Sequence, residues 1–136
     1  MPLGTALGET VSKITSVRII DVGSGQQRTE IDAIGEIKGE VPGQGFSTTV
    51  FEGVPGHPAT WAGTGRILTT SGAVVRTSSR GIAVRTGEGH KIRCRGAFSL
   101  ATDDPKLAAF NNLIGAIEFE VDPVAMTLTG IACEWK

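Results

Sequence analysis

The chain of 136 residues has the length of one domain and can bury roughly two-thirds of its unfolded surface on folding. Its formal net charge of −1 at pH 7 disfavours nucleic acid as a partner, because binding to phosphates requires a basic surface. No apolar run approaches the ~20 residues of a membrane-spanning helix. We therefore expect a single cytoplasmic domain over residues 1–136, with residues 1–13 flexible and with neither a nucleic acid nor a membrane as partner.

Glycine and proline mark turns at regular intervals, for example at Gly23-Ser24-Gly25, Ser71-Gly72 and Gly87-Glu88-Gly89. Glycine permits a positive φ and proline presets φ, so these clusters predict turns. The segments between the turns alternate apolar and polar residues, which is typical of strands with one buried face. We expect strands over residues 15–22, 28–41, 45–52, 60–70, 73–85, 90–100, 115–122 and 126–135.

The clearest strand places Ile31, Ala33 and Ile37 on one face, and Asp32 and Glu36 on the other. An antiparallel sheet with one solvated face produces this alternation. Eight such strands joined by tight connections predict an all-β, closed antiparallel barrel, because closure removes exposed sheet edges. A two-sheet β-sandwich is the alternative. Ser79-Arg80-Gly81 is a candidate β-bulge that would bend the long fifth strand.

One short helix is predicted near residues 104–113. Asp103 or Asp104 can cap it, Pro105 suits its first position and Gly115 can end it. An apolar stripe of Leu107, Phe110 and either Leu113 or Ile114 is expected to cover one mouth of the barrel. The stripe is either a fixed plug over the core or a mobile lid.

The turns also predict which residues face inward. If Ser71-Gly72 is a two-residue hairpin loop, Arg66 lies opposite Thr77 and Leu68 opposite Val75. A hairpin centred on Gly87-Glu88 places Ala83 opposite Ile92 and extends the same division of faces. The inward face then contains Thr64, Arg66, Leu68, Val75, Thr77, Ser79, Ala83, Ile92, Cys94 and Phe98. A slip of one residue in either turn would reverse part of this assignment.

An inward Arg66 would be costly to bury unless a carboxylate or several other acceptors met it. The alternation of residues 46–52 puts Glu52 on the inner side, so we expect an Arg66–Glu52 pair near one mouth. The pair either stabilises the fold or anchors a ligand, with the guanidinium polarising a carbonyl and Glu52 acting as acid or base. His57, in a proline-flanked loop at the rim, can transfer a proton. These three form the candidate catalytic set.

Trp135 shares a face with Ile131 and Cys133, so it is expected in the core at one barrel end, whereas Trp61 falls on the outer face. Cys94 and Cys133 match no zinc motif and are expected to be reduced, inward-facing and slow to react. The two histidines and loosely placed carboxylates predict neither metal nor cofactor. The candidate ligand-binding residues are Phe46, Thr48, Leu68, Thr77, Cys94, Phe98, Phe119 and Trp135.

The segments RCRGAFSL at 93–100 and DDPKLAAFNNLIG at 103–115, followed by the alternation of 117–121, resemble small bacterial barrels of the allene oxide cyclase-like, or calycin-like, group. GEIKGEV at 35–41 and the hairpin over 64–81 fit the same layout. The resemblance implies an antiparallel barrel, often dimeric or higher, whose cavity accepts a lipid- or polyketide-like molecule.

Three functions follow as hypotheses. The first is a cofactor-independent cyclase or isomerase that confines a mostly apolar substrate in the barrel. The second is a carrier or sensor that binds a small apolar ligand in the same cavity without turnover. The third is an oligomeric structural or interaction protein whose barrel is filled by its own side chains.

Overall fold

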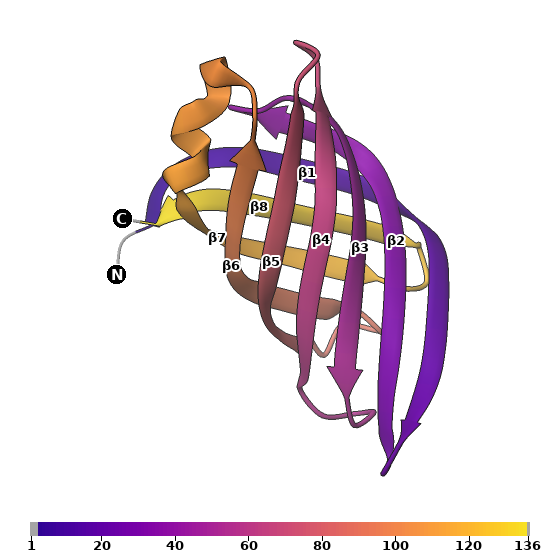
Figure 1. The fold of residues 1–136 in the computed structure, drawn as a ribbon. Helices are drawn as coiled ribbons and strands as arrows, with labels where there is room; N and C mark the ends of the chain where they lie inside the picture. The colour runs from indigo at the N-terminus through magenta and orange to yellow at the C-terminus, as the bar shows by residue number, and fades with distance from the viewer. Residues whose placement is uncertain (1–2, 136) are drawn as a thin grey trace.

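A computed structural model describes residues 3–135 and shows a closed barrel of eight antiparallel strands (Figure 1). Each strand pairs with the next along the chain, and the last pairs with the first. The elements are β1 (Leu3–Gly23), β2 (Gln26–Gly39), β3 (Gly43–Gly53), β4 (Ala59–Thr69), β5 (Val74–Arg85), β6 (Ile92–Thr102), the 3-10 helix η1 (Pro105–Asn112), β7 (Ile114–Asp122) and β8 (Thr127–Trp135). The predicted closed all-β barrel is confirmed.

The N-terminal segment differs from the expectation. Residues 3–13 are not a flexible extension, because they form the first part of β1 and pair with both β2 and β8. Residues 1 and 2 lie outside the described residues. Among the residues described, no helix has the length and apolar character that crossing a bilayer requires.

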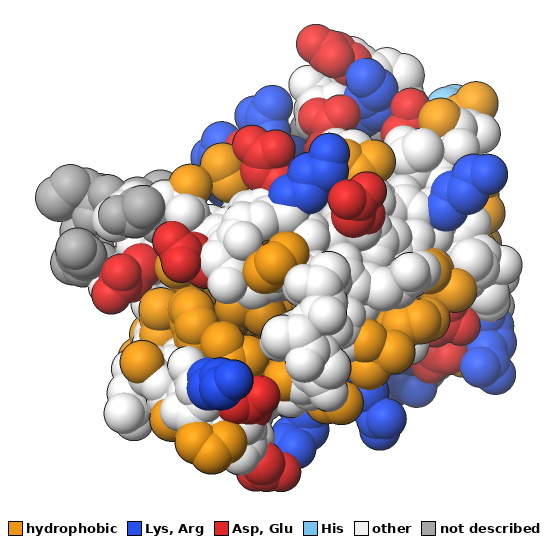
Figure 2. All heavy atoms as spheres, turned by 90° about the horizontal axis from the view of Figure 1, so that it is seen from above, with side chains coloured by type: hydrophobic (Ala, Val, Ile, Leu, Met, Phe, Trp, Pro, Cys, Tyr) orange, Lys and Arg blue, Asp and Glu red, His pale blue; other side chains and the backbone are white. Residues whose placement is uncertain are grey.

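The two ends of the barrel are built differently. One end, at the top of Figure 1, carries η1 and the connections β2–β3 and β4–β5. We call it the η1 end. The opposite end carries the four other hairpin turns, and we call it the hairpin end. Figure 2 looks onto the η1 end, where a group of hydrophobic side chains is bordered by charged ones.

The interior holds two apolar clusters, one toward each end. The cluster at the η1 end consists of Val41, Ile67, Val75, Phe98 and Leu100. The cluster at the hairpin end consists of Ile14, Ile31, Phe51, Trp61, Ala83, Cys94, Phe119, Val121 and Leu128.

Trp61 belongs to the cluster at the hairpin end. Its ring meets that of Phe119 edge to face at 4.9 Å, and its Nε1 donates to the carbonyl of Ile82 at 3.2 Å. Only 3% of Trp61 is exposed, so its predicted outward placement is wrong.

The helix prediction holds in its main points. Asp104 caps η1 by accepting a hydrogen bond from the backbone N–H of Lys106 at 2.8 Å, and Pro105 occupies its first position. Leu107, Phe110 and Leu113 pack against the cluster at the η1 end. η1 ends at Asn112, before Gly115, which belongs to β7.

The side chain of Asn111 fixes η1 to the barrel wall. Its Oδ1 accepts from the N–H of Thr102 at 2.7 Å, and its Nδ2 donates to the carbonyl of Thr102 at 3.0 Å. The amide group therefore extends the hydrogen bonding of β6 and holds η1 over the mouth of the barrel.

The β4–β5 hairpin corrects the predicted division of faces. Its loop contains the three residues 70–72: the N–H of Thr69 donates to Ala73 at 2.9 Å, and Gly72 has φ +94°. This loop is one residue longer than predicted, so Arg66 lies opposite Arg76 rather than Thr77. A shift of one residue exchanges the two faces of a strand. The inward placement of Thr64, Arg66 and Leu68 is therefore wrong.

In the β5–β6 hairpin, the strand pairing differs from the predicted pairing by two residues. Ala83 lies opposite Cys94, where we expected Ile92. Because a shift of two residues preserves the face, the predicted inward face is correct for the remaining members, which are Val75, Thr77, Ser79, Ala83, Ile92, Cys94 and Phe98.

Candidate ligand cavity

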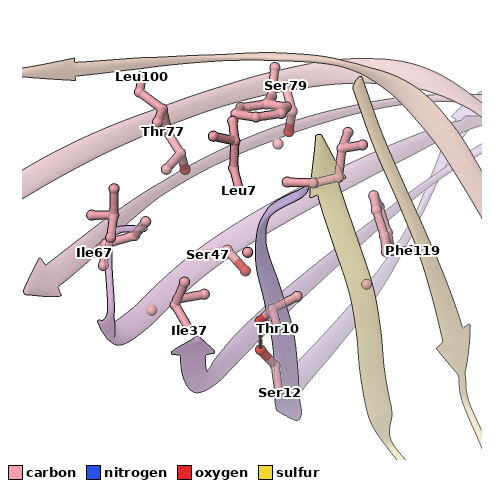
Figure 3. A pocket seen from close by; sticks show the side chains of 18 of the residues that line it. Leu7, Thr10, Ser12, Ile37, Ser47, Ile67, Thr77, Ser79, Leu100 and Phe119 are labelled. Atoms are coloured by element: carbon pink, nitrogen blue, oxygen red, sulfur yellow. Dashed lines mark hydrogen bonds between the residues drawn. The ribbon is translucent and has the colours of Figure 1, made fainter. Parts of the chain in front are cut away.

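The half of the barrel nearer η1 contains a cavity of about 180 Å³. All eight strands contribute to its wall, Leu128 lies toward the hairpin end, and Phe110 of η1 lies at the mouth. Figure 3 shows labelled lining residues around this space, Phe119 among them. A cavity of about 150 Å³ accepts benzene, whereas sites for drug-sized ligands span about 300–1,000 Å³. The volume therefore suits a molecule of one ring or a short chain.

Two glycines of β4 open a recess in the cavity wall. Gly63 lies between Thr49 of β3 and Ser79 of β5, and Gly65 lies between Ser47 and Thr77. A Cβ atom at Gly63 would stand 2.7 Å from Ser79 Oγ, and one at Gly65 would stand 2.8 Å from Thr77 Oγ1. Any larger residue would thus fill the space that the hydroxyls border. We call this feature, made of Ser47, Thr49, Gly63, Gly65, Thr77 and Ser79, the β4 recess.

The hydroxyl groups of the β4 recess are available to a ligand. Within residues 3–135, the hydroxyls of Ser47, Thr49, Thr77 and Ser79 have no protein hydrogen-bond partner, and no fully buried side-chain oxygen or nitrogen is left unpaired. These hydroxyls therefore reach the space of the cavity. Across the lumen, by contrast, Thr10 and Ser12 hydrogen-bond to each other at 3.1 Å (Figure 3).

The cavity is electrically neutral inside. Its lining includes two charged residues, Glu9 and Arg66, but the strand register places both side chains on the outer face, opposite Lys38 and Arg76. A hydroxyl both donates and accepts hydrogen bonds. The interior can therefore pair with a neutral polar group but offers no counter-charge to an ion.

The predicted catalytic residues do not meet. Arg66 is exposed on the outer face, so the expected ion pair with Glu52 is wrong. Glu52 instead accepts from Nε of Arg28 at 2.9 Å, also on the outside. His57 is exposed in the β3–β4 turn at the hairpin end, away from the cavity.

The predicted ligand-binding residues divide into two groups. Thr77, Phe98 and Phe119 line the cavity. Cys94 is fully buried but lies in the cluster at the hairpin end, outside the lining.

The others lie on the outer face. Thr48 donates to Asp32 at 2.7 Å, and Leu68 is 45% exposed. Phe46 contributes to the wall, but its side chain is 39% exposed on the outside. Trp135 does share a face with Ile131 and Cys133, but that face is the outer one.

The sequence reasoning missed the inward hydroxyls of β3 and the two glycines of β4. A usable signal was present, namely two glycines at a spacing of two within a strand, flanked by strands rich in serine and threonine. Glycine inside a strand often marks a place where a ligand or another chain comes close.

The two cysteines occupy different faces, which corrects the expectation that both face inward. Cys94 is fully buried, and this burial raises the pKa of its thiol to about 12. Cys133 lies on the outer face and is partly buried. Because the thiolate is the reactive form, we expect a disulfide reagent at pH 8 to label one thiol per native chain, and two after unfolding in urea. Labelling of both thiols in the native state would contradict this arrangement.

The fold and the cavity together define a small eight-stranded barrel with a lumen of ligand size. No family model matches the chain, and no curated protein matches it. The chain is similar in structure to a protein of unknown function from Clostridium acetobutylicum, with 13% identity, a TM-score of 0.84 and coverage of 100% of this chain and 99% of that one.

Two further solved structures have the same fold. A conserved protein of unknown function from Rhodopseudomonas palustris is 20% identical, with a TM-score of 0.79 and coverage of 98% of this chain and 99% of that one. An enzyme from Penicillium herquei is 14% identical, with a TM-score of 0.63 and coverage of 98% and 97%. The TM-scores show a shared fold.

Proposed function

We propose that this barrel binds one small neutral molecule with an apolar body and a single carbonyl or hydroxyl group. The β4 recess is the observation that carries this proposal, because it presents four unpaired hydroxyls at a place kept open by two glycines. The rest of the lining is largely apolar and would enclose the body of the ligand. A barrel filled by its own side chains is not favoured, since the cavity measures about 180 Å³.

The absence of charge inside the cavity limits the kind of ligand further. Placing an ion in an apolar lumen without a counter-charge costs several kcal/mol. A neutral ketone or alcohol loses only its hydrogen bonds to water, and the recess can replace them. We therefore expect the cavity to select neutral molecules over charged ones of the same shape.

The test compares three probes of similar size, namely cyclohexanone, methylcyclohexane and cyclohexylammonium, by ligand-observed NMR. We expect cyclohexanone to bind best and the ammonium ion not to bind. The double variant Thr77→Val with Ser79→Ala removes two hydroxyls of the recess and should weaken cyclohexanone binding about tenfold, since a hydrogen bond contributes about 0.5–1.5 kcal/mol.

The control variant is Ser78→Ala. Ser78 lies between Thr77 and Ser79 in sequence but is exposed on the outer face, so its loss should leave binding unchanged. The proposal fails if the ammonium ion binds as well as the ketone, or if the double variant and the control behave alike. Native mass spectrometry of the purified protein would in addition reveal any retained molecule.

A cyclase or isomerase is the second candidate, since an enzyme from Penicillium herquei has this fold and segments of the chain resemble the allene oxide cyclase-like group. Such an enzyme would act by holding a reactive conformer while the hydroxyls orient its polar group. Conversion of the retained molecule into an isomer, lost in the double variant and kept in Ser78→Ala, would support it. Binding without conversion would support a carrier function instead of an enzymatic one.

We also propose that the protein works in a reducing compartment such as the cytoplasm, where free cysteines stay reduced. Cys94 and Cys133 lie on opposite faces of the barrel wall, so they cannot pair with each other without rearrangement.

A further inference from the structure

The first strand is longer than its neighbour on one side. β8 pairs with β1 only as far as Lys13 opposite Thr127, and the last hydrogen bond there runs from the N–H of Ile14 to the carbonyl of Met126 at 2.9 Å. Pairing with β2, in contrast, continues to Gly23 opposite Gln26. Residues 16–22 therefore have a neighbouring strand on one side only, among the residues described. Figure 1 shows this β1–β2 hairpin projecting beyond the barrel at the lower right.

The side chains of this projecting segment are unusually apolar for an exposed position. Val17 is 43% exposed, Ile19 63% and Val22 45%. The facing strand supplies Ile31, which belongs to the cluster at the hairpin end, opposite Val17, and Thr29, which is outside that cluster, opposite Ile19. A free sheet edge with β-branched side chains is a template for pairing with another strand.

The usual protections of a free edge are weak here. Proteins guard such edges with lysine, proline, charges or β-bulges, and residues 16–22 contain neither lysine nor proline. Their two charged residues already have partners within the same hairpin. Arg18 lies 3.3 Å from a carboxylate oxygen of Glu30, and Asp21 accepts from the N–H of Gly23 at 3.0 Å. Bulges flank the segment at residues 14–16 and 21–23, which leaves the stretch between them regular.

We infer that residues 16–22 form an interface with a second copy of this chain, in which the two β1 edges pair antiparallel across a two-fold axis. An antiparallel edge is self-complementary, so one surface suffices for both partners. Centring the axis on Ile19 places two isoleucines opposite each other and offsets each Arg18 from its copy by two residues. On the inner face each Ile19 then meets its copy, and each Val17 lies diagonal to Ile19 of the second copy and directly opposite its Asp21.

The contact is small for a protein–protein interface. Seven residues of edge bury less than the ~1,600 Å² of a standard protein–protein interface. The dimer should therefore form in the micromolar range and depend on protein concentration. The ligand cavity takes no part in it, so this inference stands independently of the proposed binding function.

The test is sedimentation of the full chain from about 1 to 200 μM, a range that brackets a micromolar dissociation constant. We expect a shift from the 14.2 kDa monomer to a dimer of twice that mass. Ile19→Lys should raise the dissociation constant about tenfold or more, because the lysines would meet at the two-fold axis.

Val11→Lys is the matched control. Val11 belongs to the same strand and is 64% exposed, but it is paired on both sides, with Glu36 and Thr129. This variant should dimerise like the parent chain. Hydrogen exchange at residues 16–22 should slow with concentration in the parent and in Val11→Lys, and not in Ile19→Lys.

Two outcomes would overturn the inference. One is a monomer throughout the range, and the other is a dimer that Ile19→Lys leaves intact.

Discussion

Replacing Gly81 with alanine is expected to lower the free energy of unfolding by about 2–3 kcal/mol. Gly81 of β5 lies directly opposite Gly96 of β6, and the pairing of β5 continues through it without the bulge that the sequence suggested. A Cβ atom at Gly81 would overlap the backbone carbonyl of Arg95, and one at Gly96 would overlap that of Arg80. Backbone atoms cannot rotate away as a side chain can, so the strands would have to separate.

Gly45→Ala is the control for this prediction. Gly45 is also a strand glycine, but its nearest neighbour would be the terminal Cδ1 of Ile37 at 3.0 Å, a flexible group. Alanine also costs less chain entropy than glycine, by roughly 0.5–1 kcal/mol, which should offset this crowding. Urea denaturation of both variants measures the difference. Equal stabilities would mean that the contact between β5 and β6 relaxes freely.

Turn chemistry and alternation predicted the architecture, but a single turn decided which residues face inward. Thr70, Ser71 and Gly72 form a three-residue loop where the Ser71-Gly72 pair suggested two. Alternation gave only a weak signal in the middle of β4, because residues 62–66 are Ala, Gly, Thr, Gly and Arg and include no large apolar side chain on either face. The misplacement of Arg66 and of Trp61 comes from this one residue.

The predicted inward face of β3 was wrong for a different reason. Its inward residues Ser47 and Thr49 are polar, whereas Phe46 and Val50 on the outer face are apolar. A rule that places apolar residues inside therefore inverts this strand. Sequence rules are expected to fail at functional sites, and here the reversed pattern coincides with the β4 recess. The inward face of β5 and β6 was predicted correctly because it remains apolar toward the hairpin end.

Replacing Phe119 with alanine should have a larger effect, lowering the free energy of unfolding by about 3–5 kcal/mol. Phe119 is 5% exposed, packs on Trp61 and lines the ligand cavity. Its removal deletes the aromatic contact with Trp61 and opens space on the side of the cavity that faces the hairpin end. The variant should therefore lose stability and at the same time accept larger ligands, such as 2-adamantanone.

Phe51→Ala separates these two consequences. Phe51 belongs to the same cluster and is 8% exposed, but it does not line the cavity. We expect a comparable loss of stability in urea denaturation and no gain of 2-adamantanone binding by NMR. Phe119→Leu removes less volume and can be used if the alanine variant does not fold. It should show a smaller gain of 2-adamantanone binding. If Phe51→Ala gains the larger ligand equally, Phe119 does not bound the cavity, and the added space comes from general loosening of the core.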